Sequence, residues 1–138
     1  MPENSRKKEL KLMQEPVRVT GMVLEVSPVG ETDRRVVLLT KERGKISAFA
    51  RGARKQGSRL MAATNPFCFG EFILYEGRNS YSLSEAVIRN YFEDMRMHFE
   101  EACYGMYFLE LMDYYTRENN DEREMLLLLY QSLPKHSS

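Results

Sequence analysis

Apolar and polar residues alternate along the chain from residue 17 to about residue 88, a pattern typical of half-buried β-strands. Turn-forming residues interrupt this pattern at positions 30–33, 41–44 and 76–79. Five short strands with one helix between the third and the fourth fit a small, partly open β-barrel of the OB type. We expect these strands at residues 17–26, 35–40, 45–50, 67–75 and 80–88, and the short helix at residues 60–63.

Two residues mark irregular points in this pattern. Gly21, within the first strand, indicates a bulge or a bend of the kind that a curving barrel strand needs. Ser58 is expected to be the N-cap of the short helix.

The third strand has two different faces. Alternation places small and apolar residues on one face and places Phe49, between Lys45 and Arg51, on the other. A nucleic-acid base can stack on an aromatic ring in such a setting while the cations hold phosphates. The alternative is that a bulge resets the register, in which case Phe49 fills the core.

The apolar period changes from about 2 to about 3.6 near residues 91–93, which predicts helices. We expect two helices in residues 91–138, the second over residues 121–132 with Asn120 as its cap. Both are so apolar that they need more partners than the last few residues can supply. The predicted fold class is α+β: a flexible tail (1–16), a five-stranded OB-type barrel (17–90) and an incomplete α-helical domain (91–138). The apolar stripe of the first helix comprises Phe99, Ala102, Cys103, Met106, Tyr107, Leu109, Met112 and Tyr115.

A formal net charge of zero conceals two oppositely charged segments. Residues 34–59 contain nine Lys or Arg and one acid, whereas residues 93–124 contain ten acids and three Arg. The two segments therefore favour different partners, or they pack on each other. A β scaffold followed by a mobile basic loop at residues 52–59 suits a polyanion without a fixed base sequence.

Catalytic chemistry has little support in the sequence. His98 and His136 come without a nucleophile or an acid at useful spacing. The glycine-containing segment 52–59 lacks the Gly-Lys-Ser/Thr ending of a phosphate-binding P-loop. We expect the acids of residues 93–124 to lie on solvated helix surfaces rather than in a metal site. The expectation is a protein that is not an enzyme, with no catalytic residues, no metal and no cofactor.

Cys68 and Cys103 lie among apolar residues and are expected to be buried free thiols. The first residues lack the apolar segment of a signal peptide, and no run reaches membrane-spanning length. We therefore expect a cytoplasmic protein with no membrane partner.

Several motifs, in this order and spacing, resemble the amino-terminal OB domain of the bacterial DNA repair protein RecO family, and the resemblance covers roughly residues 17–130. The two most specific are Gly30-Glu31-Thr32-Asp33 and Ala50-Arg51-Gly52-Ala53-Arg54-Lys55, followed by Gly70-Glu71-Phe72, Leu83-Ser84-Glu85-Ala86 and Leu109-Glu110-Leu111-Met112-Asp113.

The resemblance implies a nucleoid-associated recombination mediator. Such proteins bind single- and double-stranded DNA, anneal complementary strands and, with RecR, help to load the RecA recombinase onto DNA coated by single-strand-binding protein. Because the family's DNA surface lies on the OB domain, the resemblance implies a DNA-binding role for its cations, to which strand alternation adds Phe49. These cations are Lys45, Arg51, Arg54, Lys55 and Arg59, together with Arg34 and Arg35.

One departure from the family concerns the helical domain. Full-length relatives continue into a larger helical domain, many with a four-cysteine zinc site, whereas this sequence has no Cys-x-x-Cys motif. Contacts with single-strand-binding protein, and part of those with RecR, are expected to depend on that domain.

Two other functions remain open at this point. One is a protein-interaction adaptor that docks recombination partners without direct DNA binding, which a size measurement with and without those partners would reveal. The other is an RNA-binding OB module, which the ratio of DNA to RNA affinity would test.

Overall fold

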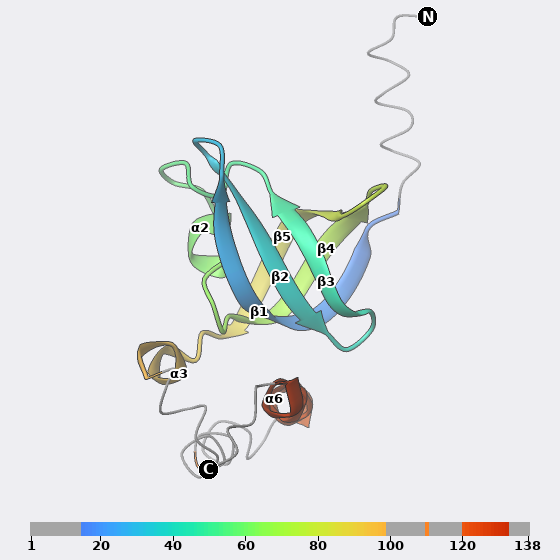
Figure 1. Cartoon of the computed structure of the whole chain (residues 1–138), viewed down its shortest axis with the longest axis vertical. Coiled ribbons are helices and arrows are strands. Elements are labelled where there is room, and N and C mark those ends of the chain that lie inside the picture. Colours follow the sequence, from blue (N-terminus) through green and yellow to red (C-terminus); the bar gives the residue numbers. More distant parts are fainter. Residues whose placement is uncertain (1–14, 99–109, 111–119, 133–138) are drawn as a thin grey trace, which may run out of the picture.

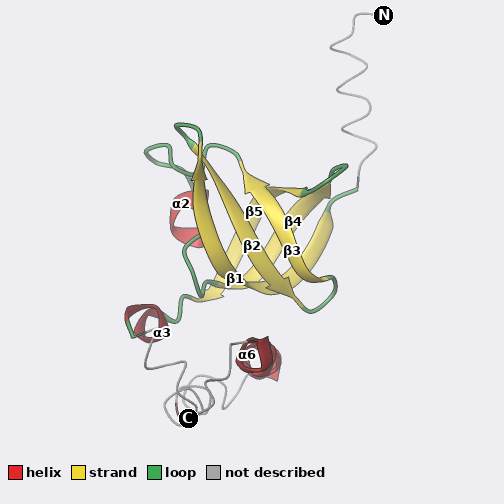
Figure 2. Ribbon diagram, viewed as in Figure 1, coloured by secondary structure: helices red, strands yellow, loops and turns green. Residues whose placement is uncertain are grey.

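Five β-strands close into a barrel in the order β1-β2-β3-β5-β4 (Figure 1). The computed structural model describes residues 15–98, 110 and 120–132. Neighbouring strands are antiparallel except β3 and β5, which are parallel. The predicted α+β class with an OB-type barrel is confirmed (Figure 2). The elements are β1 (Val17–Val29), β2 (Asp33–Thr40), β3 (Gly44–Ala50), α2 (Leu60–Ala63), β4 (Phe69–Glu76), β5 (Tyr81–Asn90), α3 (Glu93–Met97) and α6 (Asn120–Ser132).

Two strands differ from their predicted bounds. β1 continues to Val29, where it still pairs with the first residue of β2, instead of closing near residue 26. β4 begins at Phe69 rather than at residue 67, because Phe67 has a left-handed backbone with φ of 70° that cannot continue a strand.

The helices also differ from expectation in detail. Arg59, not Ser58, occupies the N-cap position of α2, and the Ser58 hydroxyl accepts a hydrogen bond from the N–H of Leu60 instead (3.2 Å). The helix that begins after β5 is described only as α3, residues 93–97. The apolar stripe predicted for residues 99–115 lies outside the described residues.

Inward-pointing side chains fill the barrel. They recur at every second position of β2, β3 and β4, as the two-residue period of a strand requires. Small side chains on β3 leave room for phenylalanine and leucine from β4. The buried residues of this core are Val19, Val23, Val36, Leu38, Ala48, Ala50, Ala53, Cys68, Phe72, Leu74 and Leu83.

The first strand bends so that it can pair with β2 on one side and β4 on the other. Gly21 pairs with both neighbours, and a Cβ atom there would lie 2.7 Å from the carbonyl oxygen of Leu39. Glycine therefore permits the close approach of the two strands. The irregularity in the pairing of β1 with β2 lies between Val23 and Glu25, a short distance beyond Gly21, where a bulge or a bend was expected.

A second apolar cluster joins the barrel to α3 and α6. The rings of Phe69 in β4 and Phe92 before α3 meet edge to face, with centroids 6.4 Å apart and planes at 62°. Figure 1 shows both helices at the same end of the barrel. The buried members of this helix-side cluster are Met22, Phe67, Phe69, Phe92, Met95, Met125, Leu126 and Leu129.

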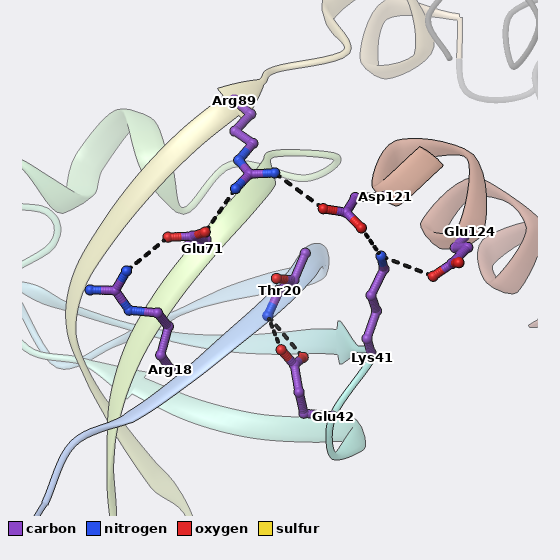
Figure 3. Close-up of polar contacts among 8 residues, drawn as sticks. All are labelled: Arg18, Thr20, Lys41, Glu42, Glu71, Arg89, Asp121 and Glu124. Atoms are coloured by element: carbon purple, nitrogen blue, oxygen red, sulfur yellow. Dashed lines mark hydrogen bonds and ion pairs between the residues drawn. The ribbon is translucent and has the colours of Figure 1, made fainter. Parts of the chain in front are cut away.

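Acidic side chains of α6 bind a cation of the basic segment (Figure 3). The Nζ atom of Lys41, in the β2–β3 turn, lies 2.6 Å from Oδ1 of Asp121 and 3.0 Å from Oε2 of Glu124. Burial alone would lower the pKa of Lys41, but hydrogen bonds and charge attraction from both carboxylates outweigh it and raise that pKa. At this contact the basic and acidic segments pack on each other.

Arg89 extends the same network along the outside of β5. Its guanidinium lies 2.7 Å from Glu71 and 3.4 Å from Asp121 (Figure 3). Glu42 is the single acid within the basic segment, residues 34–59. Both of its carboxylate oxygens accept a hydrogen bond from the backbone N–H of Thr20 (2.9 and 3.0 Å).

Glu122 departs from the prediction that the acids of this segment are solvated. Only 7% of its surface is exposed, and its carboxylate accepts a hydrogen bond from Asn90 (3.2 Å). Burial raises the pKa of Glu122, against the lowering effect of Asn90 and of the Arg89 charge. The first turn of α6 packs directly on the end of β5, which explains this burial.

Cys68 is a buried free thiol as expected, and burial raises its pKa; Cys103 lies outside the described residues. In the part of the chain that is described, no three His, Cys, Asp or Glu residues gather as a metal site would require. No described helix is long and apolar enough to cross a membrane.

Candidate nucleic-acid interface

The outer face of β2, β3 and β5 carries a row of three side chains. Strand pairing sets Arg35 opposite Phe49, and Phe49 opposite Ser82. Because Ala48 and Ala50 point into the barrel core, Phe49 points outward, where it is half-buried. The register is therefore the one that places an aromatic ring among cations on the barrel surface.

Arg35 is held along this face rather than extended into solvent. Its Nε atom donates a hydrogen bond to the hydroxyl of Ser47, one pleat further along β3 (2.9 Å). The guanidinium therefore stays near Phe49, in a position where its remaining N–H groups can reach a bound anion.

The segment after β3 is folded, which corrects the prediction of a mobile loop for its first half. Oδ1 of Asp33 accepts the backbone N–H of Gly52 (2.6 Å), and the carbonyl oxygen of Thr32 accepts the N–H of Arg54 (2.8 Å). Ala53 is fully buried in the barrel core, and Gly52 supplies the left-handed conformation (φ 70°) that the turn needs. We call residues 51–55 the anchored turn.

The anchored turn explains the two most specific motifs of the sequence. Residues 30–33 comprise the β1–β2 turn and the first residue of β2, and residues 50–55 lie against them through the hydrogen bonds of Asp33 and Thr32. The two motifs are therefore one structural unit, assembled from segments about 20 residues apart.

Besides Arg35, two of the predicted DNA-binding cations make internal contacts. The guanidinium of Arg54 donates to the carbonyl oxygen of Gly30 (3.0 Å). Arg34 donates to the carbonyl oxygen of Met61 and to the hydroxyl of Thr64 (2.8 Å each). Both side chains therefore hold the fold together at this end of the barrel.

The remaining predicted cations are exposed, and no described residue pairs with their side chains. Arg51 is beside Phe49, while Lys55 and Arg59 follow in the anchored turn and just beyond it. Lys45 lies near the beginning of β3, on the same face of the strand as Phe49. An unpaired cation is available to a phosphate without first breaking an internal ion pair. We call Lys45, Arg51, Lys55 and Arg59 the free cations.

Concave regions surround Phe49 on both sides. One, of about 520 Å³, is lined by Phe49, Arg51 and Tyr75. Another, of about 320 Å³, is lined by Phe49, Arg35 and Asn79. OB barrels bind oligonucleotides on the face of strands 2 and 3, between the β1–β2 and β4–β5 loops. The hollows around Phe49 occupy that position.

Sequence reasoning missed the residues that the β4–β5 side contributes. Tyr75 points outward from β4, and the turn after it adds Arg78, an exposed cation, and Asn79. The signal was present, because alternation separates Tyr75 from the inward-pointing Phe72 and Leu74. The predicted OB topology would also have brought the turn at residues 76–79 to this face.

Comparison with known proteins agrees with this fold and these motifs. The family model described as "Recombination protein O N terminal" matches residues 13–92. The chain belongs to the RecO family. The resemblance inferred from the sequence motifs is thereby confirmed, and both motifs, residues 30–33 and residues 50–55, lie within the matched RecO region.

Similar RecO proteins come from several bacteria. The "DNA repair protein RecO" of Alkaliphilus metalliredigens is 34% identical over 117 residues, which is 85% of this chain and 48% of that protein. The protein of the same name from Clostridium novyi is 34% identical over 78% of this chain and 42% of its own length. That of Bacillus pumilus is 35% identical over 85% and 46%, respectively. The chain spans about half the length of these RecO relatives.

Proposed function

We propose that this chain is the DNA-binding part of a recombinational repair mediator. In this proposal it binds single- and double-stranded DNA at the nucleoid, anneals complementary strands and, with RecR, assists the loading of RecA. Membership of the RecO family supports the repair role, and its relatives carry the name "DNA repair protein". The observation that carries the proposal is the outward-facing Phe49, with Arg51 beside it and Lys45 on the same face of β3, between the β1–β2 and β4–β5 turns.

The proposed mechanism needs no covalent chemistry. The free cations neutralise phosphates and release condensed counterions, so that affinity falls steeply as salt rises. Neutralising the phosphates of two strands lowers their mutual repulsion, and base pairing then proceeds. Contacts to phosphates carry no sequence information, so binding is nearly independent of base sequence.

The test is fluorescence anisotropy of a labelled oligo-dT across a salt series. The double variant Arg51→Ala with Lys55→Ala removes two free cations that make no described internal contact. We expect weaker binding and a slope of log affinity against log salt that is flatter by about 0.7 for each phosphate contact removed. The melting temperature is expected to stay near that of the unaltered chain.

A matched control removes the same charge elsewhere. Arg18 lies where β1 pairs with β4, and Arg123 is exposed on α6. Arg18 is 66% exposed and pairs with Glu71, so its loss costs little stability. Equal weakening by the double variant Arg18→Ala with Arg123→Ala would mean that net charge, not the Phe49 face, governs binding. No binding to oligo-dT at low salt would contradict the proposal directly.

A protein-docking function is the second candidate, and one observation favours it. The side of α6 that faces away from the barrel exposes Leu127 and Leu128, at 37% and 38%. In this alternative the helical part binds a recombination protein such as RecR, with or without DNA on the barrel. Light scattering after size exclusion, with and without RecR and with single-strand-binding protein as a second partner, separates the two functions.

A further inference from the structure

A second aromatic residue shares the groove of Phe49. Strand pairing sets Ser82 of β5 opposite Phe49 of β3 on one side and opposite Tyr75 of β4 on the other. The two aromatic residues therefore stand on either side of a small serine, on strands whose backbones are roughly 10 Å apart. Both line the same hollow of about 520 Å³, which we call the aromatic groove.

The rest of the groove suits a base attached to a phosphate chain. Ser82 and Ser84 are exposed and present hydroxyls between the aromatic walls. Arg51, one of the free cations, stands at the rim. Glu76 also lines the groove, but its carboxylate lies 3.5 Å from Arg43, which offsets its charge.

We infer that the aromatic groove binds a nucleobase, and that it makes the chain favour single-stranded over double-stranded DNA. This inference rests on the proposed function. An aromatic ring can stack on any base, but only when the face of that base is uncovered. Bases inside a duplex are paired and stacked on each other, so a duplex reaches the free cations but not the groove.

The preference gives annealing a direction. A single strand is held by its phosphates and by a base in the groove, whereas the duplex product keeps only the phosphate contacts. Base pairing therefore removes one source of affinity, so the duplex product dissociates more readily than the single-stranded substrate does. A surface of cations alone would hold the duplex, with its higher charge density, at least as tightly.

The experiment compares three labelled nucleic acids with the same number of phosphates at one salt concentration. They are an oligo-dT, an abasic strand of equal length and a blunt hairpin duplex. Base stacking predicts that oligo-dT binds about 5-fold to 150-fold more tightly than the abasic strand. Tyr75→Ala and Phe49→Ala are expected to remove most of this difference and to leave duplex affinity unchanged.

Two further variants separate stacking from structure. Tyr75→Phe keeps the ring and should retain the preference for oligo-dT over the abasic strand. Tyr91→Ala removes a surface aromatic that is 40% exposed after β5, outside the groove, and should leave all three affinities as they are. The comparison of oligo-dT with the abasic strand uses the unaltered chain, so it stands even if an alanine variant does not fold.

The outcomes also distinguish this inference from the proposed function. Equal affinity of the unaltered chain for oligo-dT and the abasic strand would overturn the aromatic groove and leave phosphate binding intact. A preference for oligo-dT that survives both alanine variants would likewise overturn the groove as its source. No binding to any of the three at low salt would overturn the proposed function itself.

Discussion

The cations near α6 and the cations near Phe49 have the same charge but different surroundings. Lys41 lies between two carboxylates of α6, and Arg89 between Glu71 and Asp121. In contrast, no carboxylate of the described residues pairs with Arg51 or with the other free cations. The first group joins the helices to the barrel, whereas the second group is available to a ligand.

The difference shows why a charge count is a poor guide to a binding site. The basic segment from residue 34 to residue 59 is contiguous in sequence, yet the fold divides it between α6, internal hydrogen bonds and the open face. Paired cations gain little by meeting a phosphate, because an existing ion pair must be broken first. Only the division into paired and unpaired side chains identifies the candidate surface.

The largest expected effect is on the stability of the helix-side cluster, and it tests whether that region is independent of the Phe49 face. Phe69→Ala removes a fully buried ring from the helix-side cluster, and we expect it to lower the free energy of unfolding by about 3–5 kcal/mol. Affinity of the folded fraction for oligo-dT should stay unchanged, since the Phe49 face is elsewhere. Urea unfolding and anisotropy at low temperature measure the two quantities. A fall in folded-state affinity would show that the two regions are coupled.

A smaller effect is expected at the anchored turn, where stability and binding change together. Asp33→Ala leaves the N–H of Gly52 without its acceptor, which we expect to cost about 1–3 kcal/mol. It also releases Arg51 and Lys55 from their fixed positions, so oligo-dT affinity should fall.

Asp33→Asn is the matched variant, because its side-chain oxygen can still accept the bond while the negative charge is gone. It should bind at least as tightly as the unaltered chain. Because both variants lack the negative charge, they differ only in the acceptor for Gly52. Binding by Asp33→Ala that is as tight as binding by Asp33→Asn would therefore mean that the anchor does not matter.

The Lys41–Asp121 pair predicts a pH dependence on the helix side. The hydrogen bond and charge of Lys41 lower the pKa of Asp121. The pair therefore contributes stability above the ordinary aspartate pKa of about 3.9, and this contribution is lost as pH falls through the lowered value. Asp121→Asn should reduce the melting temperature at pH 7 and have no effect at a pH below both values. A constant difference across an acid titration monitored by circular dichroism would contradict this assignment.

The smallest effect, with the opposite sign, is expected at the next residue. Burial raises the pKa of Glu122, so its ionised form disfavours the folded state at neutral pH. Glu122→Gln keeps an acceptor for Asn90 and should slightly raise the melting temperature at pH 7. The gain should disappear once pH falls below the ordinary glutamate pKa of about 4.3. A lower melting temperature at pH 7 would mean that the charge near the start of α6 outweighs its burial.

The sequence predicted the barrel because local rules determine most of it. Alternation in β3 offered the outward position of Phe49 as one of two alternatives, and the strand pairing of the structure selects it. The turns at residues 30–33 and 41–44 appear where expected. The N-cap of α2 and the start of β4 differ by one or two residues, because the left-handed backbone of Phe67 and the cap geometry depend on tertiary packing.

The candidate site was less accessible from sequence, because it depends on pairs of residues that are distant in the chain. Asp33 and Gly52 come together only when two turns pack on each other, and Tyr75 joins Phe49 only through the intervening Ser82. The hydrogen bond between Lys41 and Asp121 of α6 joins residues that are 80 positions apart in the sequence. Composition and periodicity carry no information about such pairings.

The parallel contact between β3 and β5 closes the barrel through only two paired positions, Ala48 with Tyr81 and Phe49 with Ser82. Every other strand pair is longer, so this seam is where the barrel opens with the least loss of hydrogen bonds. An occupant of the aromatic groove touches both sides of the seam. Nucleic acid bound there would therefore stabilise the pairing of β3 with β5. The backbone amides of Phe49 and Ser82 would then exchange their hydrogens with solvent more slowly once the groove is filled.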